Sequence, residues 1–200
     1  MNLFKHAQEI VMAEETTKLF LEKSINEVTI KDIANHIGIG EATIYRHYKN
    51  KSNIVLSVAR YLMNKIAHQF FNLENGNTGY EKIRSFYLSF LNIYKENPAY
   101  YKFVNELDAF MVTNSDKDIA SYEAGIDQFK NKFDEIYQLG LKDGSIKEIK
   151  DIDVFYFSTT HALLGLCKKL SDKDIISQDA KLDKAREIEV LIETILYRFK

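Results

Sequence analysis

Residues 40–51 concentrate side chains that can contact nucleic acid. The segment offers hydroxyls, a guanidinium, an imidazole and ammonium groups, at Thr43, Tyr45, Arg46, His47, Lys49 and Lys51. Guanidinium and hydroxyl groups donate to base edges and phosphates, and ammonium groups neutralise phosphates. Every charged side chain between positions 42 and 65 is basic, although the whole chain has a formal charge of −2. A basic patch on an acidic body predicts a local DNA-binding surface.

Two short helices must position these side chains. A helix is predicted over 30–37, because apolar residues recur on one face at i, i+3, i+4 and i+7, at Ile30, Ile33, Ala34 and Ile37. Thr29 can cap this helix, and Asp32 stands three residues later, where a capping box has its acidic partner. Gly38 then permits the left-handed conformation that ends a helix.

A second helix is predicted over 41–48, only two residues after Gly38. Ile44 and Tyr48 are expected to anchor it inward, which leaves the polar side chains outside. Two helices joined by so short a turn form a helix-turn-helix, which places its second helix in the major groove. A purely structural helical hairpin is the alternative interpretation.

The remainder of the chain is also predicted to be helical. One proline and eight glycines in 200 residues are too few for a turn-rich sheet protein. Further helices are predicted at about 4–23, 52–71, 79–96, 98–112, 116–141, 151–171 and 182–199. Ser52 is the expected N-cap of the fourth helix, and Pro98 marks a helix start. We expect an all-α chain with a helix-turn-helix DNA-binding domain at 1–51 and a helical effector-binding and dimerisation domain at 52–200, with helix 52–71 as the connector.

Several function classes find no support in the residues. A lone cysteine, Cys167, excludes an intramolecular disulfide, and neither a signal peptide nor an apolar run long enough for a membrane span occurs, so a cytoplasmic location is expected. No glycine-rich phosphate loop, metal-ligand cluster or nucleophile–base pair is present. We therefore expect no enzyme activity, metal or cofactor. Lys168 and Lys169 could lower the pKa of Cys167, but its apolar helix favours inert packing.

The N-terminal third resembles the DNA-binding head of the TetR (tetracycline-repressor-like) family of transcription regulators. The segments that match that pattern in type and spacing are Leu19-Phe20, Thr29 to Ala34, Gly38-Ile39, Thr43-Ile44-Tyr45 and Lys49-Asn50-Lys51. The resemblance implies a homodimer that binds a palindromic double-stranded DNA operator, and a small-molecule effector that binds among the middle helices.

The resemblance also implies individual contacts. The second helix, which begins near Gly40, would enter the major groove, and the residues nearest to the base edges would be Glu41, Ala42, Thr43 and Arg46. Gly40 itself is also a DNA-binding candidate. Phosphates would be contacted by Tyr45, His47 and Lys51, and the DNA backbone on the other side by Thr29 and Lys31. Lys49 is a further DNA-binding candidate. Two residues depart from the family pattern: Gly40 replaces a common serine cap, and Glu41 replaces a common basic residue. Glu41 can repel phosphates or accept a hydrogen bond from a cytosine amino group.

The region after residue 75 is rich in aromatic side chains, which suits the wall of a pocket for a small apolar or aromatic effector. The candidate lining residues are Phe86, Phe90, Phe103, Glu106, Phe110, Tyr122, Phe129 and His161. Asp108 is a further polar residue that interrupts the apolar pattern. For any one of these aromatic residues, ordinary core packing is the simpler interpretation.

Two apolar stripes near the C-terminus predict a dimer interface, as the resemblance implies for the last two helices. Their residues are Ile152, Phe155, Thr159, Leu163, Leu166, Ile188, Leu191, Ile192, Ile195 and Phe199. Packing within one subunit is the alternative. The combined hypothesis is a homodimeric repressor that a ligand releases from DNA. A transcriptional activator of the same fold, or a helical sensor that has lost DNA binding, is also compatible with the sequence.

Overall fold

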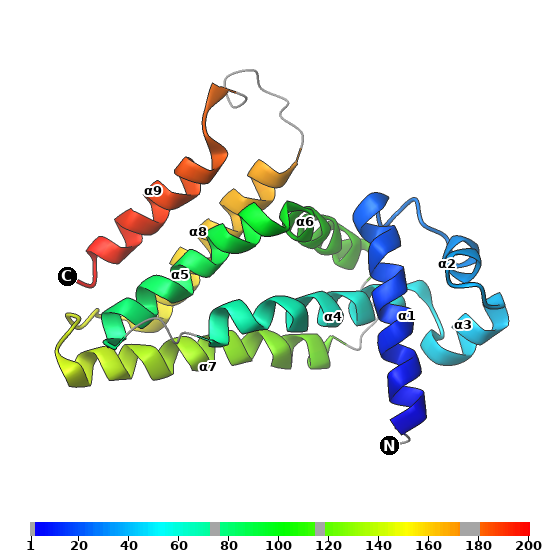
Figure 1. Ribbon diagram of the computed structural model, residues 1–200, viewed down its shortest axis with the longest axis horizontal. Helices are drawn as coiled ribbons and strands as arrows, with labels where there is room; N and C mark the ends of the chain where they lie inside the picture. The colour runs from blue at the N-terminus through cyan, green and yellow to red at the C-terminus, as the bar shows by residue number, and fades with distance from the viewer. Residues whose placement is uncertain (1–2, 73–76, 115–118, 173–180) are drawn as a thin grey trace. The chain divides into compact units, whose positions relative to one another are not determined.

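The structure is a computed structural model that describes residues 3–72, 77–114, 119–172 and 181–200, with side chains from residue 10 onward (Figure 1). These residues form α1 (Leu3–Glu22), α2 (Ile30–Ile37), α3 (Glu41–Tyr48), α4 (Lys51–Phe71), α5 (Gly79–Glu96), α6 (Pro98–Thr113), α7 (Ala120–Asp143), α8 (Ile152–Ser171) and α9 (Lys184–Tyr197). The predicted all-α class is confirmed, and the described residues contain no strand.

The start of α9 differs from the sequence prediction. Helix α9 begins at Lys184 rather than near 182, because the carboxylate of Asp183 accepts hydrogen bonds from the N–H groups of Ala185 and Arg186 and caps the helix there. The predicted start of the seventh helix, at 116–118, lies outside the described residues, and α7 begins at Ala120.

The chain divides into two compact units. The first consists of residues 1–65 and 102–125, and the second of residues 66–101 and 126–200. Helices α4, α6 and α7 therefore each contribute residues to both units. The division at residue 51, which separates a DNA-binding domain from an effector-binding domain, stays a prediction.

The first unit holds the helix-turn-helix on a core from α1, α2, α3 and α4. Helix α1 packs against α2, and α2 against α3. The core side chains are aliphatic or aromatic and are almost completely buried, as at Leu19, Phe20, Ile25, Val28, Ile33, Ile44, Ile54 and Val55. Burial of this apolar surface holds α2 and α3, two helices of eight residues each that would be marginal in isolation.

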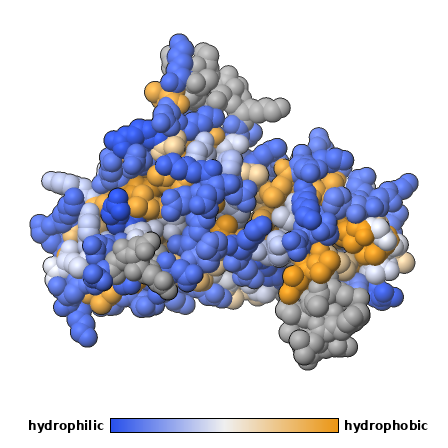
Figure 2. Space-filling view, in the orientation of Figure 1, coloured by the Kyte–Doolittle hydropathy of each residue, from blue (hydrophilic) through white to orange (hydrophobic). Residues whose placement is uncertain are grey.

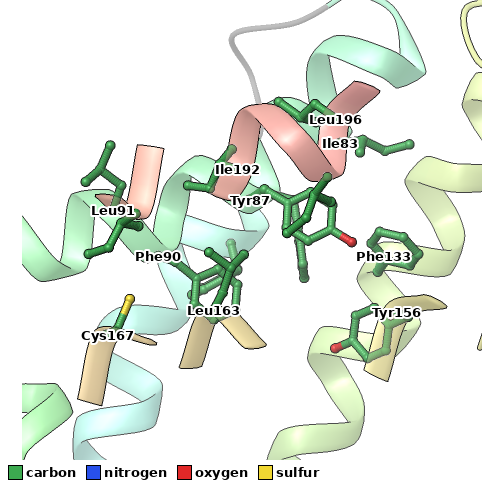
Figure 3. Packing of buried hydrophobic residues seen from close by; sticks show 14 of the residues in the cluster. Ile83, Tyr87, Phe90, Leu91, Phe133, Tyr156, Leu163, Cys167, Ile192 and Leu196 are labelled. Carbon is green, nitrogen blue, oxygen red and sulfur yellow. The ribbon is translucent and has the colours of Figure 1, made fainter. Parts of the chain in front are cut away.

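The second unit has a core of aromatic and aliphatic side chains from α5, α7, α8 and α9, together with the end of α4 (Figure 3). The Tyr87 and Phe133 rings lie 6.1 Å apart, and the Phe133 and Tyr156 rings 4.8 Å apart. The buried Tyr87 hydroxyl forms a hydrogen bond of 2.8 Å with Thr159 Oγ1, so its polar end is satisfied. Burial raises the pKa of Tyr156 to about 12.

A close approach of α5 and α7 closes one end of the second unit. Gly79 starts α5 after a capping box formed by Thr78 and Glu81. The Gly79 N–H donates to the Asp143 carboxylate at 2.7 Å, and the Tyr80 N–H donates to Ser145 Oγ at 2.9 Å. Residues at and just after the end of α7 thus satisfy N–H groups that the first turn of α5 leaves unpaired. Hydrogen bonds from Ser145 and from the Gly79 N–H hold the pKa of Asp143 below its usual value.

The face drawn in Figure 2 is mostly hydrophilic, with separate hydrophobic patches. In the second unit, large apolar side chains of the last two helices stand in solvent: Val154 is 67% and Phe157 47% exposed on α8, and Val190 is 46% and Tyr197 76% exposed on α9. Within the described part of the chain, none of the helices has both the length and the apolar content to cross a membrane.

Candidate nucleic-acid interface

The start of α2 is fixed by the predicted capping box. Thr29 has extended backbone angles, and its Oγ1 accepts a hydrogen bond from the Asp32 N–H at 3.1 Å. In return, Asp32 Oδ2 accepts from the Thr29 N–H at 2.8 Å and from the Thr29 hydroxyl at 2.5 Å. These hydrogen bonds lower the pKa of Asp32, with the bond from the Thr29 side chain as the main cause.

Through Asp32, this capping box makes the free energy of unfolding of the protein depend on pH. Because the folded protein lowers the pKa of Asp32 below the ordinary value of 3.8, ionised Asp32 stabilises the fold above that value, and the contribution disappears as the pH falls through the folded pKa. Asp32→Asn should therefore lower the free energy of unfolding, measured with urea, more at pH 7 than at pH 3. Equal losses at both pH values would contradict this assignment.

Two glycines make the tight turn between α2 and α3. Gly38 has φ 78° and ψ 30°, the left-handed conformation predicted for it, and its N–H donates to the Ala34 carbonyl at 2.9 Å. Gly40 occupies the N-cap position of α3 with extended angles and contributes no side-chain cap. Glycine has no side chain, so Gly40 cannot accept hydrogen bonds from the first N–H groups of α3 as a serine at this position could.

Helix α3 separates its buried and polar sides as predicted. Ile44 is completely buried and Tyr48 almost so, which fixes the helix on the core. The other side carries the residues predicted to touch DNA: Glu41, Ala42, Tyr45, Arg46 and Lys49 are exposed, and Thr43 and His47 are half-buried. Thr29, Lys31 and Gly40 are also exposed. The exposed side of α3 therefore presents hydroxyl, guanidinium and carboxylate groups, while the buried side packs on the core.

The turn into α4 differs from the sequence prediction. Ser52 is buried and does not cap the helix; Asn50 does, because its Oδ1 accepts from the Asn53 N–H at 2.9 Å. Lys49, just before it, has φ 65°, a conformation that costs energy for any residue with a Cβ. The Asn53 side-chain amide donates to the Tyr48 carbonyl at 2.7 Å and closes the turn. Ser52 and Asn50 both have capping side chains, so spacing alone did not distinguish them.

Lys51, the predicted phosphate ligand, is the first residue of α4 and is half-buried. Its Nζ donates to the Asn26 carbonyl at 3.4 Å and lies 5.9 Å from the centre of the Phe110 ring. Partial burial lowers the pKa of Lys51. These contacts hold the ammonium group beside the turn that precedes α2.

The predicted effector-pocket residues fall into both units. In the second unit, Phe70 makes edge-to-face contacts with Phe86, Phe90 and Phe129, at ring distances of 5.0–5.2 Å. In the first unit, Phe103 and Phe110 are buried and Tyr122 is half-buried, with a pKa raised by burial to about 12.

The polar residues predicted to line the effector pocket differ in their unit and in their exposure to solvent. Glu106 Oε2 accepts a hydrogen bond from the Ile25 N–H at 2.7 Å in the first unit. In the second unit, His161 is exposed on α8, and its ring lies 5.8 Å from that of Phe157. Asp108 is exposed on α6. Cys167 is completely buried, and burial raises its pKa to about 12, the opposite of the activation that neighbouring lysines could cause.

The predicted dimer residues divide by burial. Leu163, Ile188, Ile192, Ile195 and Phe199 are buried in the core of their own unit, whereas Ile152, Phe155, Thr159, Leu166 and Leu191 are half-buried. The first group packs inside its own unit, and the assignment of both groups to a dimer interface stays a prediction. The outward positions of the same helices are those of Val154, Phe157, Val190 and Tyr197, which the apolar stripes of the sequence did not include.

Comparisons with known proteins agree with this arrangement. Residues 14–58 match the family model described as "Bacterial regulatory proteins, tetR family". An HTH-type transcriptional regulator of Staphylococcus aureus is 38% identical over 53 residues, which are 26% of this chain and 29% of that protein. The alignment therefore spans less than a third of the curated relative that it matches.

Solved structures match over nearly the full length. The TetR-family transcriptional regulator PfmR from Thermus thermophilus has a TM-score of 0.67 at 17% identity, over 94% of this chain and 98% of that one. AibR, solved in complex with isovaleryl coenzyme A and operator DNA, has a TM-score of 0.64 at 13% identity, over 96% and 99%. At these identities the likeness concerns the fold. Residues 14–58 are therefore similar in sequence to the N-terminal segment of the tetR family of bacterial regulatory proteins, and the described chain shares the fold of the solved TetR-family structures.

Proposed function

We propose that this protein is a transcriptional regulator that binds a palindromic DNA operator as a homodimer. The observation that carries the proposal is the division of α3, whose buried Ile44 and Tyr48 hold an exposed face with Tyr45 and Arg46 toward solvent. Arg46 can donate to base edges, and Tyr45 can donate to phosphate. Lys51, at the N-terminus of α4, adds a cation where the helix dipole already favours an anion.

Selection of bound duplexes from random double-stranded DNA tests this function. We expect an enriched inverted repeat, with half-sites about one helical turn or a multiple of it apart. Its affinity should fall with salt, because the protein releases counterions from the phosphates that it neutralises. Binding that is equally strong to every duplex would overturn an operator-reading function.

We assign the dimer contact to the outward faces of α8 and α9. Val154 and Phe157 share one face of α8, and Val190 and Tyr197 share one face of α9, by the i, i+3 and i+7 spacing of a helix. A groove between the two helices is lined mainly by apolar atoms, from Leu166, Leu182, Val190 and Leu191 among others. A two-fold axis through this surface would pair identical patches, as a palindromic operator requires.

Phe157→Glu should convert the dimer to a monomer at micromolar concentration. The two-fold axis brings two carboxylates into one interface, where each loses hydration. Sedimentation velocity gives the mass directly. Val112→Glu is the matched control, since Val112 is 83% exposed on α6 and should tolerate the charge without change of mass. An unchanged dimer in Phe157→Glu would contradict the assigned surface.

For the effector, we propose a small apolar or aromatic molecule that binds among the aromatic side chains of the second unit. The support is the cluster of Phe86, Phe90 and Phe129 around Phe70. AibR, which has the same fold, was solved with isovaleryl coenzyme A bound. A ligand can release the operator only by binding the DNA-free conformation more tightly. We propose repression as the outcome, which in vitro transcription with and without the ligand tests.

A further inference from the structure

One face of α6 makes three contacts with the helix-turn-helix part of the first unit. Phe103, Glu106 and Phe110 share this face, at i, i+3 and i+7. The Phe103 ring stacks on Phe20 of α1, with 6.4 Å between ring centres and 27° between planes. Glu106 accepts from the backbone of the turn before α2, and Phe110 lies under the Lys51 ammonium. The face touches α1, the α1–α2 turn and the start of α4.

Of these three contacts, that of Glu106 is a hydrogen bond, which depends most strongly on direction as well as on distance. Ile25 is completely buried, and its N–H lies in the turn between α1 and α2, beyond the end of α1 at Glu22. The Glu106 carboxylate accepts from this N–H at 2.7 Å, across 81 positions of sequence. A hydrogen bond to a charged acceptor is stronger than one to a neutral acceptor. Removal of the acceptor would leave a buried N–H without this partner, which folded proteins rarely tolerate.

The same turn leads to the residues that face DNA. The carbonyl of Asn26, the next residue, accepts from Lys51 Nζ at 3.4 Å. Thr29, three positions further on, begins α2 through its capping box. Glu106 and Lys51 therefore hold adjacent residues of one short segment, and this segment sets the start of α2.

We propose that Glu106 is a positioning residue for DNA binding. Its carboxylate, through the Ile25 N–H, holds the α1–α2 turn so that Thr29 and Lys51 lie where the phosphates of one operator half-site require them. The inference rests on the proposed DNA-binding function and adds to it a residue outside the helix-turn-helix. When the turn is released, a smaller fraction of the protein is competent to bind, and the apparent affinity falls by that fraction.

The test compares Glu106→Ala with Glu106→Gln. The amide oxygen of glutamine can still accept from Ile25, so Glu106→Gln should keep operator affinity within about twofold, whereas Glu106→Ala should weaken it about tenfold. Hydrogen exchange of the Ile25 amide, followed by NMR without DNA, should accelerate about tenfold in Glu106→Ala only. Asn105→Ala, which removes an exposed polar side chain of α6, is the control and should match wild type in both measurements.

The two measurements together separate a positioning role of Glu106 from a purely structural one. Faster Ile25 exchange with unchanged operator affinity would make the hydrogen bond structural only and overturn the positioning assignment. Unchanged exchange would overturn the hydrogen bond itself. If Glu106→Ala does not fold, Glu106→Met fills a similar volume without an oxygen acceptor and should give the same tenfold loss. A wild-type protein that binds no DNA would refute the proposed function instead, and the exchange measurement would still report on the bond.

Discussion

Arg46→Ala should weaken operator binding by about 5- to 150-fold, equivalent to about 1–3 kcal/mol for a base contact. The side chain is exposed on the polar side of α3, and its removal creates no cavity. The unfolding free energy should therefore stay within about 0.5 kcal/mol of wild type. Fluorescence anisotropy with the selected operator and with variants of it measures the affinity. If Arg46 reads a base, the variant should also discriminate less at one position of each half-site.

Tyr45→Ala should give the contrasting pattern that marks a phosphate contact. Its loss of affinity should be nearly uniform across DNA sequences, because phosphates carry no sequence information. Arg84→Ala is the matched control for Arg46→Ala, since it removes an exposed arginine from α5 in the second unit. Wild-type affinity in Arg46→Ala and Tyr45→Ala together would favour a helical sensor that no longer reads DNA.

Gly79→Ala should destabilise the protein by about 1–3 kcal/mol, and by more if the backbone cannot shift. A Cβ at Gly79 would lie 2.1 Å from both Cα and N of Gly140, so backbone of α5 or α7 must move. That movement would also strain the hydrogen bond of the Gly79 N–H to Asp143. Thermal unfolding followed by circular dichroism should show a decrease of about 2–4 °C in Tm for each kcal/mol lost.

Two other glycines provide a graded control. A Cβ at Gly125 would meet only the flexible end of the Met63 side chain, which can rotate away, so the loss should be smaller. A Cβ at Gly165, inside α8, would meet nothing within 4 Å, and alanine there should stabilise the helix by up to about 1 kcal/mol. Equal melting temperatures for Gly79→Ala and Gly165→Ala would show that α5 and α7 do not approach so closely.

The helix-turn-helix could be predicted from the residues of one short segment. Thr29 and Asp32 are three residues apart, Gly38 immediately follows the helix that it ends, and Ile44 and Tyr48 are one turn apart. Each of these signals acts within four residues of chain, so local geometry decides it whatever the rest of the protein does. At Asn50 and Ser52, two capping side chains compete within one turn, so local spacing does not decide which of them caps α4.

The partner that each apolar or polar face meets depends instead on how the helices pack. Periodicity shows that α8 and α9 carry apolar stripes, but it cannot tell a stripe that packs inside the subunit, such as that of Ile188 and Ile192, from an outward pair such as Phe157 and Tyr197. Glu106 interrupts an apolar pattern, which marked it as unusual without identifying its acceptor role. Its partner, the Ile25 N–H, is 81 positions away. Contacts at such distance form only when the whole chain has folded, because packing is a property of the fold rather than of any segment.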